Sequence, residues 1–539
     1  MNTRILFPRR VACVVLSGGI ASVAMAQAPV ARNDAYVIAM NSNITLNALN
    51  NDFDPDPGDT LRITGITQPQ NGKVALRATD SGITFVPDQN FTGRVTFTYT
   101  LVDVPVQDVA SSETIGTITI DVVAIAGRGN GPGEQSVSQA LDKVCSAQAD
   151  SGVGSNRDTA GATLNLGQES LRNRCAGLLE LRASNPAAFD AAINQITPEE
   201  TIALMRAADT GAQGQSNMVT SHLTNQSKGG TSFSVNGATW QSPIGGSAGD
   251  DVKTSPWSLF ASVQLENADK KKTLLENGFK SNANAIVAGV DYSINSAWVA
   301  GAAGGFTKSD LTYANGDGSM SSNISSLIIY GLYSFNSFSW DAQIGTSRSS
   351  YDIHRQIHYA ETGNSPVVFA AQGQTNGQQN FVSSQIQYSF NYKALSLYPS
   401  VKISYASSSI DAYGESNAGG FDVNLGARNN TRADVIAGLS AQYALNFNWC
   451  ALVPNANLNI INEVSSSHDP VSGDFAYAPT NTSSFTLQSE DNDASYYQGA
   501  LGASVVLPRG IGAFFNYQNT FGYENYTAHA VEAGVRMEF

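Results

Sequence analysis

The chain has 539 residues, a formal net charge of −15 from 30 Lys and Arg against 45 Asp and Glu, and a mean hydropathy of −0.15. After the first 26 residues no run approaches the roughly 20 apolar residues that a membrane-spanning helix needs, so a polytopic helical membrane protein is excluded. The acidic balance argues against a nucleic-acid-binding protein, because nucleic acid attracts basic surfaces.

The N-terminal segment has the order of features of a secretory signal peptide. Arg4, Arg9 and Arg10 form a basic start, an apolar core follows, and Ala24 to Ala26 places small residues before a cleavage point. The sequence therefore predicts that the chain is exported and that residues 1–26 are removed. A buried N-terminal helix is the alternative.

Residues 27–125 are predicted to form a small β-sandwich. The segment is rich in Val, Ile, Thr and Phe, with Asn, Asp, Gly and Pro between the apolar stretches. Short strands at this spacing are typical of a sandwich, and about 95 residues suit one such domain. The predicted strands are Asn43–Asn47, Leu61–Ile66, Lys73–Arg77, Gly82–Pro87, Val95–Leu101 and Gly116–Val123.

Several motifs of this segment resemble those of a bacterial cadherin-like, or immunoglobulin-like, repeat. In chain order they are Asn33–Tyr36, Asn51–Asp56, Gln68–Gly72, Phe85–Asp88 and Phe97–Tyr99. Such repeats usually occur as tandem arrays in large surface adhesins. This chain holds one, which weakens any inference of long-range adhesion.

Asp52, Asp54, Asp56 and Asp59 crowd one loop of the predicted sandwich. Carboxylates this close repel one another unless a cation joins them, and hard oxygen ligands favour Ca²⁺. The loop is not an EF-hand, because prolines interrupt it and no Glu closes it at the required position. These residues are therefore a candidate Ca²⁺ site, and a solvated acidic turn is the alternative.

A Gly-rich linker at residues 126–133 separates the sandwich from a helical region at residues 134–226. Ala, Leu, Gln and Arg dominate this region, and β-branched residues become rare. Helices are predicted at Gln139–Cys145 and Ser170–Arg182. A second flexible linker, rich in Gly and Ser, follows at residues 227–250.

A further helix start is predicted at Thr197. Thr197 would be the N-cap, Pro198 would occupy the first helical position, and Glu200 would close a capping box.

Three cysteines remain after the signal peptide. Cys145 and Cys175 are placed to form a disulfide in an oxidising compartment, and two free buried thiols are the alternative. Cys450 has no obvious partner.

Residues 251–539 are predicted to form a transmembrane β-barrel. Runs of roughly ten residues alternate apolar and polar residues. In the final run Val535 and Met537 fall on one face of the strand, and Arg536 and Glu538 fall on the other. A soluble sandwich also contains such strands, so the loop pattern has to separate the two interpretations.

Twelve such runs begin near Trp257, Ala285, Trp298, Ile324, Phe338, Phe381, Leu395, Asp434, Trp449, Tyr497, Ile511 and Tyr526. Short connections lie at Asn295–Ser296, Asn336–Ser337, Lys393–Ala394, Asn446–Asn448 and Pro508–Gly510. They alternate with long ones at Asn267–Asn282, Arg355–Gln379, Ser409–Arg432 and Glu463–Ser495, and with two shorter ones. Aromatic residues flank four of the five short turns, with Tyr398 and Trp449 among them. This is the layout of an outer-membrane barrel, the closed sheet that can cross lipid.

The same region resembles the autotransporter β-domain, the translocator of type V secretion. The resemblance is carried by Trp257–Phe260, Val287–Tyr292, Leu327–Tyr333, Gly522–His529 and Gly534–Phe539. It implies a twelve-stranded barrel, a helix in the pore drawn from Gln213–Gln226, and an N-terminal passenger displayed outside the cell. It also implies that the terminal Phe539 belongs to the signal read by the barrel assembly machinery.

The strand count fixes the expected topology. Twelve strands return the C-terminus to the side where the first strand begins, and the short turns mark that side as periplasmic. Everything before Trp257 therefore has to run through the lumen to reach the outside. Self-cleaving autotransporters often use an Asn-Asn junction in the pore helix, and none lies in the linker, so the passenger is expected to stay attached.

The positions of the histidines limit which catalytic sites the chain can contain. The chain has five histidines, and none of them lies between Gln27 and Ser221. The exported part outside the pore segment therefore has no imidazole to act as a general base, which excludes a Ser-His-Asp or Cys-His site within it. We expect the protein not to be an enzyme.

The favoured interpretation is an outer-membrane autotransporter that displays a short non-catalytic passenger on the cell surface for adhesion or cell contact. Its expected partners are outer-membrane lipid, the barrel assembly machinery and an unidentified extracellular ligand, with no nucleic acid and no cofactor besides the possible Ca²⁺. The alternative is an outer-membrane pore whose N-terminal domain stays in the periplasm and binds an envelope component.

Overall fold

The computed structural model describes residues 27–77, 81–106, 110–149, 165–228, 233–235, 238–240, 256–363, 365–447, 449–479, 483–490, 493–507 and 511–538. The signal peptide expected at residues 1–26 and the terminal Phe539 lie outside these ranges. The chain divides into two compact units. One comprises Met1–Tyr36 and Asn43–Asp121, and the other comprises Val37–Ser42 and Val122–Phe539.

The N-terminal strands form two sheets, as the sandwich prediction requires. They are β1 (Asp34–Ala39), β2 (Ile44–Leu46), β3 (Thr60–Ile66), β4 (Gly72–Leu76), β5 (Ile83–Pro87), β6 (Gly93–Val104) and β7 (Glu113–Val123), with a 3-10 turn η1 (Ala48–Asn50). One sheet has the order β1-β7-β6-β3 and the other the order β2-β5-β4. Each of the six predicted strands is present. The prediction missed β1, in which Asp34, Tyr36 and Ile38 are buried.

The interior of the sandwich follows from the period of two in its strands. Along β6 the side chains of Val95, Phe97, Tyr99 and Leu101 are buried, while the residues between them are more exposed. Buried residues from β7 and β5 complete the core between the sheets, so a short chain of alternating apolar residues is enough to build this unit.

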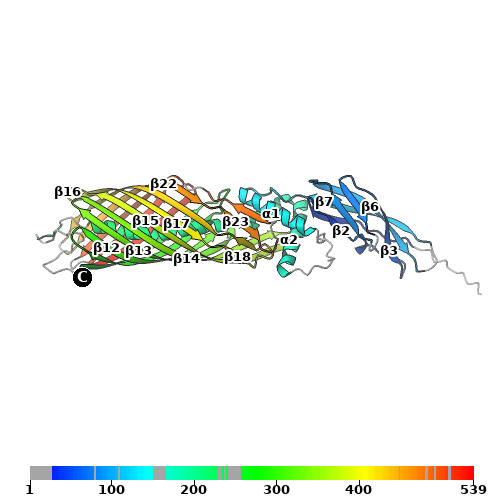
Figure 1. The fold of residues 1–539 in the computed structure, drawn as a ribbon, viewed down its shortest axis with the longest axis horizontal. Coiled ribbons are helices and arrows are strands. Elements are labelled where there is room, and N and C mark those ends of the chain that lie inside the picture. Colours follow the sequence, from blue (N-terminus) through cyan, green and yellow to red (C-terminus); the bar gives the residue numbers. More distant parts are fainter. Residues whose placement is uncertain are drawn as a thin grey trace, which may run out of the picture. The chain divides into compact units, whose positions relative to one another are not determined.

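The C-terminal strands close into a barrel (Figure 1). Among the described residues it has twelve main strands: β10 (Trp257–Lys270), β11 (Phe279–Ser293), β12 (Trp298–Tyr313), β13 (Gly318–Phe335), β14 (Phe338–Ala360), β15 (Pro366–Tyr388), β17 (Leu395–Ile410), β20 (Arg428–Tyr443), β22 (Ala451–His468), β25 (Ser495–Leu507), β26 (Ile511–Phe521) and β27 (Tyr526–Glu538). Short strands β16 (Phe390–Tyr392) and β21 (Leu445–Asn446) and a 3-10 turn η3 (Ala314–Gly316) lie beside the turns. Pairing of β10 with β27 closes the sheet, so the predicted twelve-stranded barrel is confirmed.

The outer face of the barrel is apolar. On β10 the side chains of Trp257, Leu259 and Val263 point outward and are about half exposed, at 50%, 48% and 47%. The alternate residues Ser258 and Ser262 point inward and are buried. A soluble protein does not expose such a continuous apolar surface, whereas a barrel in lipid has to.

Exposed aromatic side chains form a belt beside the short turns, as predicted. Trp257 packs on Tyr292 and Trp298 on Tyr333, each pair with ring centroids 4.7 Å apart. Further exposed aromatics of this belt are Phe335, Phe338, Trp340, Tyr388, Phe390, Tyr392, Tyr443, Phe447 and Trp449. Tyr398 was wrongly counted among them, since it is only 2% exposed and belongs to the inward face of β17.

The opposite ends of several strands extend beyond the predicted lengths. The expected long loop Arg355–Gln379 is wrong, because β14 continues to Ala360 and β15 begins at Pro366. Outward residues in this part of β15 are polar, such as Gln374 and Gln378. Strand segments above the lipid can carry polar residues on both faces. The alternation of apolar and polar residues that identified the lower parts of the strands is therefore absent there.

Two of the other three long connections, Ser409–Arg432 and Glu463–Ser495, also contain strands. They are β18 (Tyr413–Ser416), β19 (Val423–Leu425), β23 (Val471–Phe475) and β24 (Ser484–Leu487). Strand β15 pairs with β18, β18 with β19, β19 with β23, and β23 with β24. The barrel therefore carries a small sheet at its long-loop end.

Four α-helices precede the barrel in the described chain: α1 (Pro132–Ala149), α2 (Leu166–Ser184), α3 (Pro186–Ile196) and α4 (Ala203–Lys228), with a 3-10 turn η2 (Glu199–Ile202) before α4. Strands β8 (Phe233–Val235) and β9 (Ala238–Trp240) form a hairpin after them. No helix of the described residues has the length and apolar character needed to cross a membrane.

Helices α1 to α3 pack on the small sheet to form a cap on the barrel. Figure 1 shows α1 and α2 at the end where β18 and β23 lie, opposite the end where the chain terminates. Helix α1 packs against β24, and α3 packs against β14. The shared core contains Leu141, Leu178, Phe189, Phe421 and Phe475, all buried. The cap is thus one folded body built from two distant parts of the sequence.

Helix ends in the cap are set by asparagine side chains. Asn165 accepts a hydrogen bond from the backbone N–H of Gln168, whose side chain completes a capping box. Asn185 ends α2 and also caps α3. The capping box predicted at Thr197 is wrong. Its hydroxyl donates to the carbonyl of Ile193 at 2.8 Å, so Thr197 closes α3 instead of opening the next helix.

Candidate functional site

Helix α4 lies inside the barrel. Near its C-terminal end, Met218, Val219 and Leu223 pack against Val287 and Leu332 on the inner wall. At its N-terminal end, Leu204 and Ala208 belong to a cluster with the inner faces of β11 to β14 near the cap. The helix expected within Gln213–Gln226 therefore starts earlier and occupies the lumen from the cap end toward the short turns.

Polar side chains of the wall fix the rotation of α4. Gln215 Nε2 donates to Thr307 Oγ1 on β12 at 2.7 Å. On another side of the helix, Gln343 Nε2 on β14 and Lys402 Nζ on β17 donate to Thr220 Oγ1 at 2.8 and 3.0 Å. These bonds bridge α4 to three strands, so the helix is held in one register rather than lying loosely in a pore.

A second set of bonds surrounds Asp209 near the cap end. Ser408 Oγ donates to Asp209 Oδ1 at 2.6 Å and Gln379 Nε2 donates to the same oxygen at 3.2 Å. Asn430 Nδ2 donates to Asp209 Oδ2. The carboxylate of α4 is thereby joined to β15, β17 and β20.

The lower part of α4 is fixed by a buried cluster around Asp291 of β11. Tyr330 Oη donates to Asp291 Oδ1 at 2.7 Å, and Ser258 Oγ donates to Oδ2 at 2.8 Å. His222 Nε2 of α4 lies 2.9 Å from Oδ2, and its ring stacks on Phe260 with centroids 3.7 Å apart. Although Ser, His and Asp meet here, Ser258 bonds to the carboxylate and not to the imidazole, so the arrangement is not that of an activated serine.

The connection from the cap to α4 is also buried and polar. Arg355 on β14 pairs with Glu415 on β18 at 3.1 and 2.5 Å and donates to the carbonyl of Ile196 at 3.0 Å. Tyr313 Oη donates to the carbonyl of Glu200 at 2.7 Å. Burial raises the pKa of the Glu200 side chain to about 8, and its Oε1 accepts from Asn277 at 3.1 Å. The cap is therefore bonded to the barrel wall through its backbone as well as its core.

The direction of α4 sets the route of the chain. The helix begins beside the cap, at the long-loop end, and ends near the short turns. Strand β10 then starts at Trp257, within the aromatic belt at the short-turn end. The residues of the cap, which precede α4 in the sequence, consequently lie at the long-loop end of the barrel.

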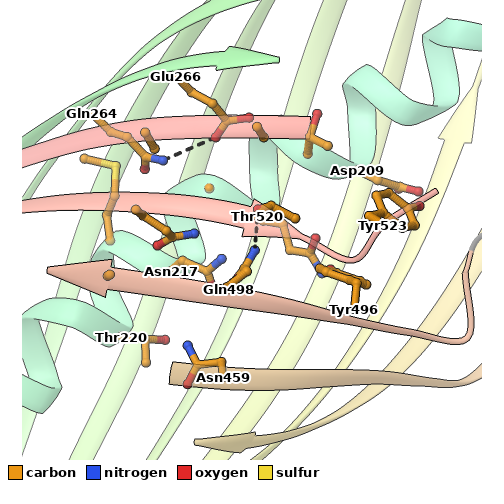
Figure 2. Close-up of a pocket in the computed structure, with 18 of the residues that line it drawn as sticks. Asp209, Asn217, Thr220, Gln264, Glu266, Asn459, Tyr496, Gln498, Thr520 and Tyr523 are labelled. Atoms are coloured by element: carbon orange, nitrogen blue, oxygen red, sulfur yellow. Dashed lines mark hydrogen bonds between the residues drawn. The ribbon is translucent and has the colours of Figure 1, made fainter. Parts of the chain in front are cut away.

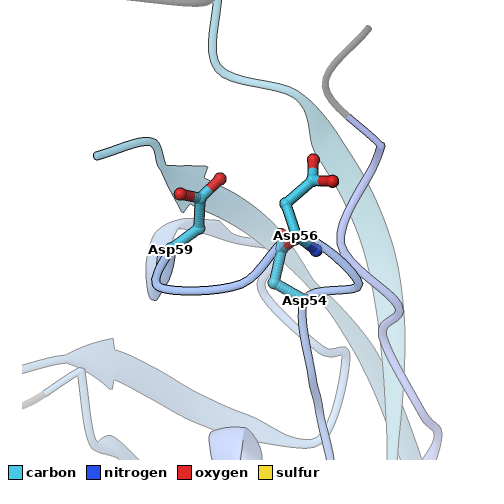
Figure 3. A group of neighbouring side chains, drawn as sticks. All are labelled: Asp54, Asp56 and Asp59. Atoms are coloured by element: carbon cyan, nitrogen blue, oxygen red, sulfur yellow. The ribbon is translucent and has the colours of Figure 1, made fainter. Parts of the chain in front are cut away.

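In the N-terminal unit the structure brings together three of the four candidate Ca²⁺ ligands. One carboxylate oxygen from each of Asp54, Asp56 and Asp59 lies within 4.8 Å of the others, around the loop shown in Figure 3. Each carboxylate also accepts a backbone N–H, at 2.8 Å from Asp56, 2.7 Å from Gln27 and 3.0 Å from Val106, respectively.

Asp52 is separate from this cluster. Its carboxylate accepts from Tyr99 Oη at 2.8 Å and from the backbone N–H of Arg32 at 2.7 Å. Burial raises its pKa above the ordinary value, and burial together with the charge of Asp52 raises the pKa of nearby Asp34 to about 7. Asp52 thus acts as a structural acceptor in the sandwich, and the Ca²⁺ hypothesis rests on the other three residues.

The structure joins Cys145 of α1 to Cys175 of α2 in a disulfide, with Cα atoms 5.3 Å apart. Both residues are buried in the core of the cap. Cys450 is buried and carries a free thiol. The proposed assembly role of Phe539 concerns a residue outside the described ranges.

Sequence reasoning missed the residues of the wall that hold α4. Thr307, Gln343 and Lys402 appear in the sequence only as the polar members of alternating strands. That signal identifies the lumen face, but which residue meets which side of the helix depends on strand register and on helix rotation. Neither can be read from one sequence.

Two families match separate parts of the chain. Residues 259–518 match the autotransporter β-domain, and residues 26–121 match a bacterial Ig domain. The comparison with curated proteins finds no match.

Solved structures with a similar barrel include the translocator domain of the autotransporter NalP from Neisseria meningitidis. It is 15% identical, covers 61% of this chain and 98% of its own, and has a TM-score of 0.44. The β-domain of the Bordetella autotransporter Brka is 15% identical, with coverages of 53% and 100% and a TM-score of 0.39. The outer membrane protease OmpT from Escherichia coli is 10% identical, with coverages of 54% and 99% and a TM-score of 0.27.

The cluster around Asp291 predicts a strong effect of Asp291→Leu on barrel stability. The substitution leaves the hydroxyls of Ser258 and Tyr330 and the ring of His222 without their acceptor, at about 1–3 kcal/mol for each buried group. The temperature at which the folded barrel loses its compact migration in SDS gels should fall by several degrees. Ser258→Ala, which removes one bond of about 1 kcal/mol, is the control and should shift it much less. Equal transition temperatures for Asp291→Leu and the unchanged protein would contradict the assigned role.

The Asp54, Asp56 and Asp59 cluster predicts stabilisation by Ca²⁺. Adding Ca²⁺ should raise the free energy of unfolding of the N-terminal unit in the full-length protein, by about 2.7 kcal/mol when the ion is at 100 times its Kd. The thermal unfolding temperature of this unit should rise accordingly. Replacing all three residues by Asn should abolish the shift, whereas Asp88→Asn, at an exposed acid outside the cluster, should keep it. No shift up to about 10 mM Ca²⁺, well above the Kd of weak extracellular sites, would show that the loop is a solvated acidic turn.

Proposed function

We propose that the N-terminal Ig domain of this protein is an adhesive module. The barrel, which matches an autotransporter β-domain, lies in the outer membrane, and the Ig domain is displayed at the cell surface. The Ig domain would bind a ligand on another cell or surface, and the barrel would anchor it. The proposal combines a translocator with a single small passenger that has no catalytic histidine.

One observation supports the proposal most directly, and it is the direction of α4. The helix runs from the cap at the long-loop end to the short turns, where β10 begins. Long loops face the outside in outer-membrane barrels, so the chain upstream of α4 starts from the outer end. The alternative, a pore with a periplasmic N-terminal domain, requires the opposite direction.

The cap supports a passenger that stays attached. Its helices share a core with β18, β19, β23 and β24, and Arg355 bonds both to Glu415 and to the carbonyl of Ile196. A segment bonded this closely to the barrel would hold the passenger at the cell surface even if the chain were cut within the lumen. A tethered passenger suits adhesion better than release into the medium.

A non-catalytic role is part of the proposal. The barrel is a translocator, and the exported residues between Gln27 and Ser221 have no imidazole for general base catalysis. We further propose the division into signal peptide (1–26), Ig domain (27–125), linker (126–133), helical region (134–226), linker (227–250) and barrel (251–539). Insertion by the barrel assembly machinery, with Phe539 in its recognition signal, completes the proposal.

Deleting residues 31–121 tests the adhesive role. Cells that carry the deletion should bind a host-cell layer or one another no better than cells without the protein, because the barrel and the cap alone offer no Ig domain. Binding is counted microscopically, and the amount of folded barrel in the outer membrane is matched by its heat-modifiable migration. An epitope tag placed before residue 126 shows that the cap remains exported.

Two outcomes would contradict the proposal. Undiminished binding after the deletion would assign adhesion to the cap or to the barrel loops. Equal binding by cells with and without the full-length protein, against every surface tried, would remove adhesion and leave display of the Ig domain for another purpose.

A further inference from the structure

The inner face of the barrel wall is polar, as Gln264 and Thr520 show in Figure 2, whereas the outer face carries few charges. In the twelve main strands, as far as the structure describes them, the Lys and Arg side chains that point outward are Lys280, Lys308 and Arg348. They lie on β11, β12 and β14. The outward positive charge of these strands is therefore gathered on one side of the barrel.

Lys308 and Arg348 stand at the border of the lipid. On β12, Lys308 is the next outward residue after the exposed Phe306, and on β14, Arg348 follows the exposed Ile344 after one polar outward residue. Each lies ten residues from the start of its strand in the aromatic belt. A tilted strand of that length rises about 23 Å, at roughly 3.3 Å per residue and about 45°, and the apolar band is roughly 25 Å tall. Both side chains consequently reach the level of the lipid headgroups at the long-loop end.

Other strands have no charge at this level. At the same distance from the belt along β10, β15 and β17, the outward residues are Asn267, Gln378 and Tyr405. The lipid border therefore does not require basic residues as such. The pair on β12 and β14 is a local feature of the outer face.

Strand β13 lies between the two basic residues. In the register Lys308 is opposite Asn323, and Arg348 is opposite Ser325. Two strand spacings of roughly 4.8 Å and an offset of two residues place the Cα atoms of Lys308 and Arg348 about 12 Å apart. The side chains of Asn323 and Ser325 are short, so the two long basic side chains border a shallow polar seat on β13.

The two basic groups of this seat are not neutralised by the protein. Lys280 pairs with Asp269 at 3.7 Å, whereas within the described chain Lys308 and Arg348 form no ion pair with a carboxylate. Asp310 is the next outward residue of β12 and lies further from the lipid. Positive charge is thus left at the headgroup level, where an anionic group of a lipid can pair with it. Arg and Lys are the side chains that bind phosphate oxygens best.

The surroundings of the seat suit the rest of a lipid molecule. On the membrane side, Phe306, Leu327 and Ile344 are exposed and offer an apolar surface to acyl chains. On the outer side, Asn376 and Gln378 of β15 point outward, and Gln378 lies opposite Arg348 in the register. Amide side chains both donate and accept hydrogen bonds, as the hydroxyls of sugars require.

A glycolipid with phosphate groups on its sugars matches all three parts of this surface. Its phosphates would pair with the basic side chains, its sugar hydroxyls would bond to the amides, and its acyl chains would cover the apolar residues. A free phosphate ion would use only the basic pair. A phospholipid with a small headgroup would leave the amides of β15 without a partner.

We propose that Lys308 and Arg348, on either side of β13, form a binding site for a phosphorylated glycolipid of the outer leaflet. The site holds one such lipid against β12 to β15, and it is continuous with the apolar face that the barrel already presents to the membrane. It depends on the barrel alone and not on the adhesive role of the Ig domain.

Binding of purified lipid A, a glycolipid with two phosphates, tests the proposal. Full-length protein in a mild nonionic detergent is titrated with lipid A, and native mass spectrometry counts the lipid molecules bound. One lipid should bind with preference over the rest. Lys308→Gln with Arg348→Gln should weaken this binding at least tenfold.

A matched double variant controls for the loss of two charges. Lys280→Gln with Lys393→Gln removes the outward base that is already paired with Asp269 and a base in a short turn at the other end of the barrel. This variant should bind lipid A as the unchanged protein does. Heat-modifiable migration shows that each variant barrel is folded.

The same titration with other lipids identifies the group that is recognised. Lipid A without phosphates should bind at least tenfold more weakly, and phosphatidylglycerol should not displace lipid A at equal concentration. Inorganic phosphate at about 10 mM should not displace it either, since the acyl chains and the sugars contribute to binding.

Three results would overturn the proposal. Equal binding of lipid A by the Lys308 and Arg348 variant and by the unchanged protein would remove the two residues from any site. Equal binding of lipid A with and without phosphates would remove the phosphate contact. Equal binding of phosphatidylglycerol would show that the surface selects negative charge and not a glycolipid.

Discussion

A sheet that crosses lipid has to leave no unpaired edge, and the pairing of β10 with β27 meets this constraint. Once the sheet closes, each strand has one face in lipid and one in the lumen. Leu259 and Val263 then have to point outward, and Ser258 and Ser262 inward. An even number of strands also places both ends of the barrel chain at the short-turn side. The location of the upstream residues depends on this closure more than on any single contact.

A closed barrel of this size leaves a lumen that side chains of the wall do not fill, and α4 is the part of the chain that occupies it. The helix stays there because the wall supplies partners for its polar groups, among them Thr307 for Gln215 and Asp291 for His222. These partners lie on one half of the wall. The other half faces α4 across an amide-lined cavity, so the helix lies off-centre in the lumen.

The lower halves of the strands were predictable because lipid demands apolar residues at every second position. The upper halves were not: outward residues of β11 such as Lys280 and Asn282 carry no apolar period, since that part of the strand stands in water. The cap was missed for a different reason. Its core unites Leu178 and Phe189 with Phe421 and Phe475, and contacts between segments so far apart leave no local signal.

Local capping chemistry was misleading where two helices meet. Thr197 has the composition of an N-cap, yet its hydroxyl closes α3, because that helix ends at Ile196 immediately before it. In the candidate Ca²⁺ loop the sequence grouped four aspartates. The fold assigns Asp52 to Tyr99 and leaves three together, a separation that depends on which residue of β6 lies opposite the loop.

Display of the N-terminal unit depends on the outward placement of the chain upstream of α4, and protease treatment of intact cells measures this placement directly. An antibody against residues 31–124 would follow the Ig domain, and a tag in the short turn at Ser296 would report whether the outer membrane is intact. We expect loss of the Ig signal while the tag at Ser296 stays protected. An Ig signal that survives until the outer membrane is broken would contradict it and place the N-terminal unit in the periplasm.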